Sequence, residues 1–184
     1  KEGRQTTLRM ELEIVKEYIA LQQMRYDFII EMNIEDGSYL DQPTVRMLFQ
    51  PLVENAIRYG LGDDEKISIQ VFEDVARHFA VVTISDSGKG LNQEEIDEIN
   101  QPFDYDWGYW KNENRGIGLR YVKAMLESFY DGQTSLFVNS KKGFGTKITI
   151  LLPVREPEEK KEKDKEVTLE ENKVGQTDER IDCR

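Results

Sequence analysis

Residues 50–60, with the sequence QPLVENAIRYG, hold the most informative pattern in the chain. Apolar residues recur there at three- and four-residue spacing, which predicts an amphipathic helix over residues 44–59, closed by Gly60. Glu54 and Asn55 lie within this helix. A side-chain amide oxygen facing a polyphosphate suits Mg²⁺, which prefers oxygen ligands, and it adds no negative charge. Taken alone, the dipeptide is more typical of a buried pair that satisfies a helix end.

A second motif, Asp86-Ser87-Gly88-Lys89-Gly90, follows a predicted strand over residues 79–85. A carboxylate held at a strand end can accept a hydrogen bond from an exocyclic amine such as adenine N6, and a base edge left unpaired there would weaken binding. Gly88 and Gly90 remove side chains that would block a ring and permit positive φ. By itself, Asp-Ser-Gly is a common turn.

Two further glycine motifs are Gly116-Ile117-Gly118-Leu119, which opens a predicted helix over residues 118–130, and Gly143-Phe144-Gly145-Thr146, which precedes the last predicted strand. Amides at a helix N-terminus bind phosphate, and glycine lets the backbone come close. The first motif is flanked by four cations, Lys111, Arg115, Arg120 and Lys123. The Thr146 hydroxyl can share a water with Asp86. Alone, each motif is typical of an ordinary loop or hairpin turn.

Arg58 and Tyr59 follow Asn55 by about one helical turn, on the same face of the predicted helix. The guanidinium can neutralise phosphate oxygens and the ring can pack against a purine, although each alone is typical of an ordinary surface helix. Each of the four motifs alone is weak evidence for a function. Their occurrence together in this order is strong evidence, because each purely structural explanation would need a separate coincidence. No G-x-x-x-x-G-K-[ST] phosphate loop occurs. Together the motifs predict an ATP site of a different kind.

Composition narrows the classes of protein. The 184 residues, 38% of them apolar, suit one domain with appendages, and the net charge of −11 argues against nucleic-acid binding. The single cysteine, Cys183, excludes a disulfide framework and fits a reducing cytosol. No apolar run approaches the roughly 20 residues that span a bilayer. Because the sequence begins at Lys1 rather than Met, we expect it to be a piece of a longer protein.

Hydrophobic periodicity predicts the other elements. They are helices over residues 6–30, with Thr6 or Thr7 as cap, and 94–100, a strand over 28–34, and two hairpins, 67–73 with 79–85 and 134–140 with 146–152. Residues 155–184 are mostly charged and are expected to be disordered. His78, the single histidine, is expected to be a solvated turn residue.

The motifs together resemble the catalytic ATP-binding domain of sensor histidine kinases, in the superfamily shared with DNA gyrase B, Hsp90 and MutL. Residues 50–60 resemble its N box, 86–90 its G1 box, 116–119 its G2 box, and Gln101-Pro102-Phe103 a reduced F box. The sequence Gln-Pro-Leu-Val-Glu-Asn is most similar to that of the LytS/YesM-like subgroup. The resemblance covers about residues 6–154.

This resemblance implies an α/β (α+β) two-layer sandwich, the Bergerat-type ATP-binding fold, in which helices cover one face of a mixed sheet. It divides the chain into a helix that follows the phosphoacceptor segment (1–30), the ATP-binding catalytic domain (31–154) with a flexible lid (91–115), and the charged tail (155–184).

The resemblance also implies roles for individual residues. Asn55 is expected to hold Mg²⁺, and Glu54 with Asn55 forms the candidate catalytic pair. Asp86 is expected to bind the adenine amine. The expected nucleotide-binding set is Asn55, Arg58, Tyr59, Asp86, Gly88, Gly90, Arg115, Gly116, Gly118, Leu119 and Thr146.

Two departures from the family pattern matter. The phosphoacceptor histidine, in an Asn-Pro-His-Phe-like context, is not in the sequence, so the acceptor is expected outside it. Hydrolytic members place a general-base Glu four residues before the Asn, where this chain has Pro51. A kinase can dispense with that base when the acceptor imidazole is the nucleophile. The role of Glu54 stays open.

The leading interpretation is therefore a protein-histidine kinase domain that uses ATP and Mg²⁺. Its expected partners are the dimerisation helices of the full-length protein, a homodimer, and a response regulator, within the cytoplasmic part of a membrane-anchored bacterial protein. One alternative is an ATP-driven conformational clamp or ATPase, which Pro51 disfavours. Another is a nucleotide-binding interaction module without catalysis.

Overall fold

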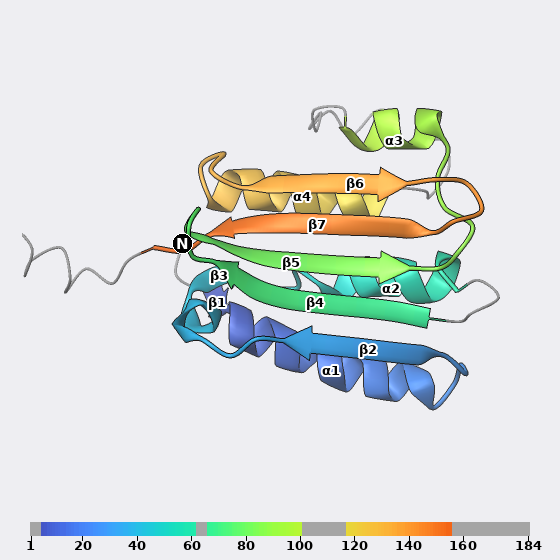
Figure 1. The fold of residues 1–184 in the computed structure, drawn as a ribbon, viewed down its shortest axis with the longest axis horizontal. Helices are drawn as coiled ribbons and strands as arrows, with labels where there is room; N and C mark the ends of the chain where they lie inside the picture. The colour runs from blue at the N-terminus through green and yellow to red at the C-terminus, as the bar shows by residue number, and fades with distance from the viewer. Residues whose placement is uncertain (1–4, 62–65, 101–116, 156–184) are drawn as a thin grey trace, which may run out of the picture. The chain divides into compact units, whose positions relative to one another are not determined.

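The computed structural model describes residues 5–61, 66–100 and 117–155. The chain divides into two units, residues 1–154 and 155–184, and nearly all described residues belong to the first. That unit contains a five-stranded sheet with the order β2-β4-β5-β7-β6 (Figure 1). Its strands are β2 (Ile29–Ile34), β4 (Lys66–Asp74), β5 (Phe79–Asp86), β6 (Ser135–Ser140) and β7 (Thr146–Pro153).

The sheet is mixed, because β2 runs parallel to β4 whereas the other neighbouring strands are antiparallel. The helices α1 (Leu8–Gln23), α2 (Gln50–Tyr59) and α4 (Ile117–Phe129) lie along one face of it (Figure 1). The predicted two-layer α/β sandwich is thus confirmed, and so are the two predicted hairpins, β4–β5 and β6–β7.

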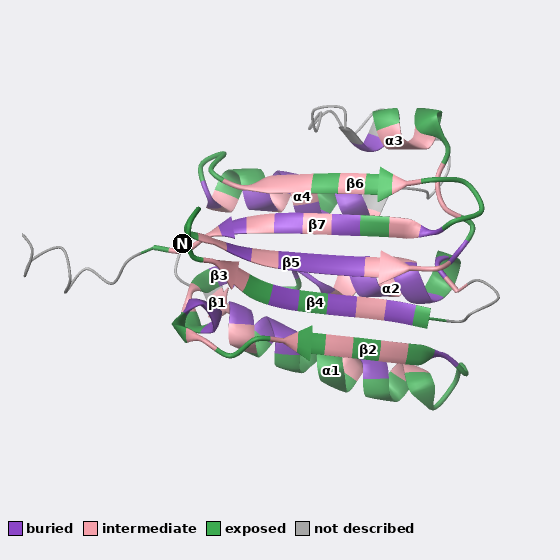
Figure 2. Ribbon diagram, in the orientation of Figure 1, coloured by how far each residue is buried: buried purple, intermediate pink, exposed green. Residues whose placement is uncertain are grey.

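Alternating burial along the strands produces this layering. On β4, Ile67, Ile69 and Val71 are buried while Lys66 and Gln70 are exposed (Figure 2). Successive side chains of a strand point to opposite faces, so the apolar row packs against the helices. The helices add buried residues at helical spacing, namely Leu8, Leu12, Val15 and Ile19 from α1 and Leu52, Val53, Ala56 and Ile57 from α2.

The helix α1 is shorter than the predicted span of residues 6–30. It begins after Thr7, whose Oγ1 accepts a hydrogen bond from the Met10 amide at 3.2 Å. The residues before it form the strand β1 (Gln5–Thr7), and β2 begins at Ile29. The predicted helical span therefore included residues that belong to strands at both of its ends.

The prediction that the second helix begins near Thr44 is wrong. Pro43–Val45 forms the strand β3, which pairs antiparallel with β1, and β-branched Thr44 and Val45 suit that pairing. Met47 then adopts φ of 57°, which no helix tolerates. The helix α2 consequently starts only at Gln50.

The short helix predicted near residues 94–100 is confirmed as α3 (Gln93–Asn100). The rest of the predicted lid, residues 101–115, lies outside the described residues, as does nearly all of the tail at 155–184. His78 is exposed in the turn between β4 and β5, as predicted. In the described ranges, no helix is both long and apolar enough to cross a membrane.

Candidate functional site

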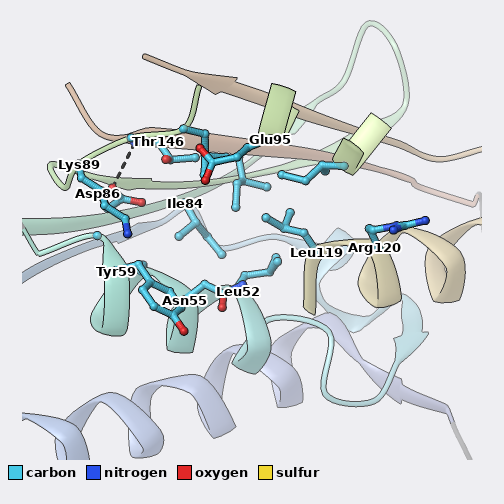
Figure 3. A pocket seen from close by; sticks show the side chains of 16 residues that line it. Leu52, Asn55, Tyr59, Ile84, Asp86, Lys89, Glu95, Leu119, Arg120 and Thr146 are labelled. Carbon is cyan, nitrogen blue, oxygen red and sulfur yellow. Dashed lines mark hydrogen bonds between the residues drawn. The ribbon is translucent and has the colours of Figure 1, made fainter. Parts of the chain in front are cut away.

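A pocket opens where α2, α3 and the start of α4 meet the ends of β5 and β7 (Figure 3). Six of the predicted site residues line it, namely Asn55, Tyr59, Asp86, Gly90, Leu119 and Thr146. The other lining residues are Leu52, Ala56, Gly60, Ile84, Lys89, Leu91, Glu95, Ile99, Arg120 and Ile148. Residues from motifs far apart in the sequence thus share one cavity that combines apolar walls with a few polar groups, as ligand sites do.

Asp86, the last residue of β5, is fixed by main-chain donors. Its Oδ1 accepts hydrogen bonds from the amide of Gly88 at 3.0 Å and from the amide of Thr146 at 3.1 Å, the second of which is drawn in Figure 3. Burial raises the pKa of this carboxyl, and the two amides lower it. Because both donors bind the same oxygen, the carboxylate is held in one orientation and Oδ2 keeps its capacity to accept a hydrogen bond from a ligand.

Two glycines bring the Asp86 loop against the end of α2. A Cβ at Gly88 would lie 2.4 Å from Gly60 Cα, and a Cβ at Gly60 would lie 2.5 Å from Asp86 Cβ. Gly88 thus makes room for backbone and does not itself line the pocket, whereas Gly90 does and has φ of 64°. The contact sets the distance between Asp86 and the pocket residues of α2.

Asn55 lines the middle of the pocket from α2. It lies next to the first turn of α4, since a Cβ at Gly118 would come within 3.3 Å of Asn55 Nδ2. Among the described residues, no three His, Cys, Asp or Glu side chains form a metal-binding group. A single amide oxygen beside a polyphosphate still fits Mg²⁺, which takes most of its ligands from phosphates and water in such sites.

Tyr59, in the last turn of α2, lines the pocket near Asp86 (Figure 3). Lys89 Nζ lies 5.4 Å from the centroid of its ring, within the range of a cation–π interaction. Tyr59 is 42% exposed, so part of its surface remains open to a ligand. An aromatic ring here can stack on a purine base.

Thr146, the first residue of β7, contributes through its main chain as well as its side chain. Its amide donates to Asp86, and its Oγ1 lies 2.9 Å from Ser140 Oγ. The hydroxyl is therefore tied to the neighbouring strand while it lines the pocket.

Other predicted site residues lie elsewhere. Glu54 does not line the pocket, and its Oε1 accepts a hydrogen bond from Gln50 Nε2 at 3.0 Å. Arg58 is exposed on α2 and also lies outside the lining. Gly118 adjoins Asn55 but is not a lining residue, and Arg115 and Gly116 fall outside the described residues.

Sequence reasoning did not single out Lys89 or Glu95. Lys89 lies within the Asp86 motif itself, and this position in the sequence could have identified it as a site residue. Glu95 belongs to a reciprocal cap at the start of α3: the Asn92 amide donates to Glu95 Oε2 at 2.8 Å, and the Glu95 amide donates to Asn92 Oδ1 at 2.9 Å. The Asn-x-x-Glu spacing is the sequence signature of that cap.

Solved structures with a similar fold include two histidine kinases. "Acinetobacter baumannii histidine kinase AdeS" matches with a TM-score of 0.59 and 17% identity, over 83% of this chain and 67% of that chain. A histidine kinase domain from the Erythrobacter litoralis EL346 blue-light activated histidine kinase matches with a TM-score of 0.54 and 17% identity, over 80% of this chain and 61% of that one. At this identity the likeness shows the fold alone.

Sequence relatives include the sensor protein kinase HptS of Staphylococcus aureus strains, such as bovine RF122 / ET3-1, which is 30% identical over 148 residues. The match covers 80% of this chain but only 28% of the length of that relative. The family model described as "Histidine kinase-, DNA gyrase B-, and HSP90-like ATPase" matches residues 40–156, which include all four of the motifs singled out in the sequence. The chain therefore belongs to the histidine kinase-, DNA gyrase B- and HSP90-like ATPase family.

Proposed function

We propose that this chain is the ATP-binding catalytic domain of a two-component sensor histidine kinase, which transfers the γ-phosphoryl group of ATP to a histidine outside this sequence. The observation that supports this most is the convergence of Asn55, Tyr59, Asp86 and Thr146 on one pocket. Membership of the ATPase family and the likeness to a sensor protein kinase support it further.

Each of these residues has a proposed task. Asp86 Oδ2 accepts the adenine N6 hydrogen bond, and Tyr59 with Thr146 contacts the base. Asn55 holds Mg²⁺, which neutralises phosphate charge when it is bound. Gly116 and Gly118 let phosphate approach the start of α4, while Arg58 and Arg115 are proposed to contribute positive charge toward the phosphates.

The proposed transfer needs positioning more than a protein base. The acceptor imidazole nitrogen forms the new bond to the γ-phosphorus. The bond between the γ-phosphorus and the β–γ bridging oxygen breaks, and ADP departs with its electrons. Position 51 is proline, and Glu54 hydrogen-bonds Gln50 rather than lining the pocket. The helix α2 thus presents no carboxylate to activate water, which favours the kinase over the alternative of an ATP-hydrolysing clamp.

The partners follow from the proposed reaction. They are the helices that carry the phosphoacceptor histidine, which we also expect to dimerise the full-length protein, and a response regulator that receives the phosphoryl group. The chain spans 28% of the length of its sensor-kinase relative, which leaves room for such parts and for a membrane anchor in proteins of this kind.

The experiment is to mix this chain and Mg·ATP with a separately expressed phosphoacceptor segment of the full-length protein. We expect an acid-labile phosphohistidine on that segment, and none when Asp86→Asn replaces the wild type. Nucleotide binding without phosphohistidine would contradict the kinase proposal. Steady ATP turnover by the chain alone, lost in Glu54→Ala, would support the hydrolase instead.

A further inference from the structure

Arg120 lies at the end of the pocket opposite Asp86. In Figure 3, Asp86 and Lys89 stand at one side of the cavity and Arg120 at the other, with Leu119 between them. Arg120 occupies the first turn of α4, where the helix dipole adds positive potential. A ligand that fills the pocket from Asp86 therefore directs its far end toward a cation.

The guanidinium of Arg120 has no anionic partner among the described residues. Its Nε is buried and makes no hydrogen bond. Arg9, by contrast, has two carboxylate partners, because it contacts Asp41 at 2.8 Å and Asp36 at 3.1 Å. A buried donor without an acceptor is unfavourable, and arginine remains charged at every physiological pH, so this end of the pocket is prepared for an acceptor with negative charge.

The nearest candidates among the pocket residues do not neutralise this charge. Glu95 is the other acidic residue of the lining besides Asp86, and its Oε2 binds the Asn92 amide in the cap of α3. Lys89, the second cation of the lining, lies over the Tyr59 ring at the Asp86 end. Lys123, about one turn further along α4, lines a second, separate pocket instead. Arg120 is thus the described cation that faces the far end.

We propose that Arg120 binds the phosphate chain of the nucleotide and makes the pocket favour di- and triphosphates over the nucleoside. This inference rests on the proposed function, because it takes the base to be held at Asp86. A guanidinium suits the task, since its planar set of N–H donors matches two phosphate oxygens at once. The ligand class is an adenine nucleoside polyphosphate, and the contact is independent of the metal at Asn55.

The test compares binding of adenosine, AMP, ADP and ATP by calorimetry, without metal, in the wild type, Arg120→Gln and Arg120→Lys. For Arg120→Gln we expect ATP and ADP to bind about tenfold or more weakly and adenosine to bind as before. Arg120→Lys should recover part of the loss, because lysine keeps the charge without the planar donor pair. Arg77→Gln, an exposed arginine in the β4–β5 turn, makes the same change in net charge and should alter no affinity.

The outcomes separate this inference from the proposed function. If the wild type binds both adenosine and ATP, and Arg120→Gln leaves their affinity ratio unchanged, Arg120 is not a phosphate ligand. An equal loss for adenosine and ATP would likewise overturn the inference, since it would mark a general packing role. If the wild type binds neither compound, the nucleotide site fails and the inference fails with it. Should Arg120→Gln not fold, the ratio measured with Arg120→Lys decides.

Discussion

Glu11, in the first turn of α1, and Leu48, two residues before α2, are joined by a buried hydrogen bond in which the Leu48 amide donates to Glu11 Oε2 at 3.0 Å. Glu11 is 1% exposed, and within the described part of the chain its Oε1 has no hydrogen-bond partner. Phe49, the N-cap residue of α2, supplies no side-chain cap of its own. A carboxylate near this helix end provides the negative charge that the N-terminus favours, and it ties α1 to the helix that carries Asn55.

This contact gives a pH-dependent prediction. Burial raises the pKa of Glu11 above its usual 4.5, with the amides of Leu48 and Met47 opposing that rise. The folded state therefore binds a proton at Glu11 more tightly than the unfolded state does. This proton binding contributes fully to the free energy of unfolding below pH 4.5, and the contribution is lost as the pH rises through the higher pKa of the folded state. In urea denaturation, the stability of Glu11→Gln relative to wild type should increase over that interval. A difference in stability that stays constant with pH would contradict the raised pKa of Glu11.

Truncation of the same side chain should have the opposite effect. Glu11→Ala leaves the Leu48 amide buried without an acceptor, which is expected to destabilise the fold by about 1–3 kcal/mol at neutral pH. Glu13→Ala, an exposed glutamate on the same helix, is the matched control and should change stability little. Equal effects of the two substitutions in denaturant titrations would show that the contact with Leu48 contributes nothing.

Gly88→Ala should disrupt the site through backbone contact. The added methyl would meet Gly60 Cα at 2.4 Å, and because no flexible side chain is there to move aside, the Asp86 loop must shift away from α2. We expect adenine nucleotide affinity to fall by about tenfold or more. Gly132→Ala is the control, since its Cβ would meet nothing within 4 Å and only its φ of 74° is unfavourable. Nucleotide affinity that falls equally in both variants would argue against a specific role for the Gly60–Gly88 approach.

Tyr59 can be tested as a base contact. Tyr59→Ala should weaken adenine nucleotide binding by about tenfold, whereas Tyr59→Phe, which keeps the ring, should stay close to wild type. Tyr26 provides a control of similar geometry, because it is 49% exposed and Arg25 lies 6.0 Å from its ring, yet it does not line the pocket. If Tyr26→Ala weakened binding as much as Tyr59→Ala, the stacking role would be wrong.

Asn55 should affect the metal-dependent part of binding. Asn55→Ala is expected to lower ATP affinity in the presence of Mg²⁺ and to leave it nearly unchanged in a chelator, because the amide oxygen is lost but the base contacts remain. Asn139→Ala, on an exposed position of β6, is the control for loss of an amide. An equal loss of affinity with and without Mg²⁺ would show that Asn55 acts on the nucleotide directly.

Local motifs allowed much of the site to be predicted. Asp86 follows a strand whose apolar run is plain in the sequence, and Asn55 and Tyr59 lie one turn apart on a helix, so short-range patterns placed all three. The start of α2 was missed because it depends on the pairing of β3 with β1, which are about 40 residues apart and carry no local signal of each other.

The cations show a second limit of sequence reasoning. Arg120 was one of four positive residues around the same glycine motif, and nothing in the spacing predicted that Arg120 would line the cavity while Lys123 would not. Gly60 likewise looked like a simple helix terminator, yet the structure shows that it also admits the Asp86 loop. The position of Arg120 at the pocket and the contact of Gly60 with the Asp86 loop both depend on segments that are distant in the sequence and close in the fold. A local sequence pattern does not contain this information.

The most direct measurement is calorimetric titration of wild type and Asp86→Asn with ATP, with GTP as a parallel ligand. If Asp86 Oδ2 recognises the adenine amine, the wild type binds ATP in preference to GTP, and Asp86→Asn loses most of its ATP affinity while remaining folded. Equal ATP affinity of the two proteins, or no preference for ATP in the wild type, would contradict the assignment of this pocket as an adenine nucleotide site.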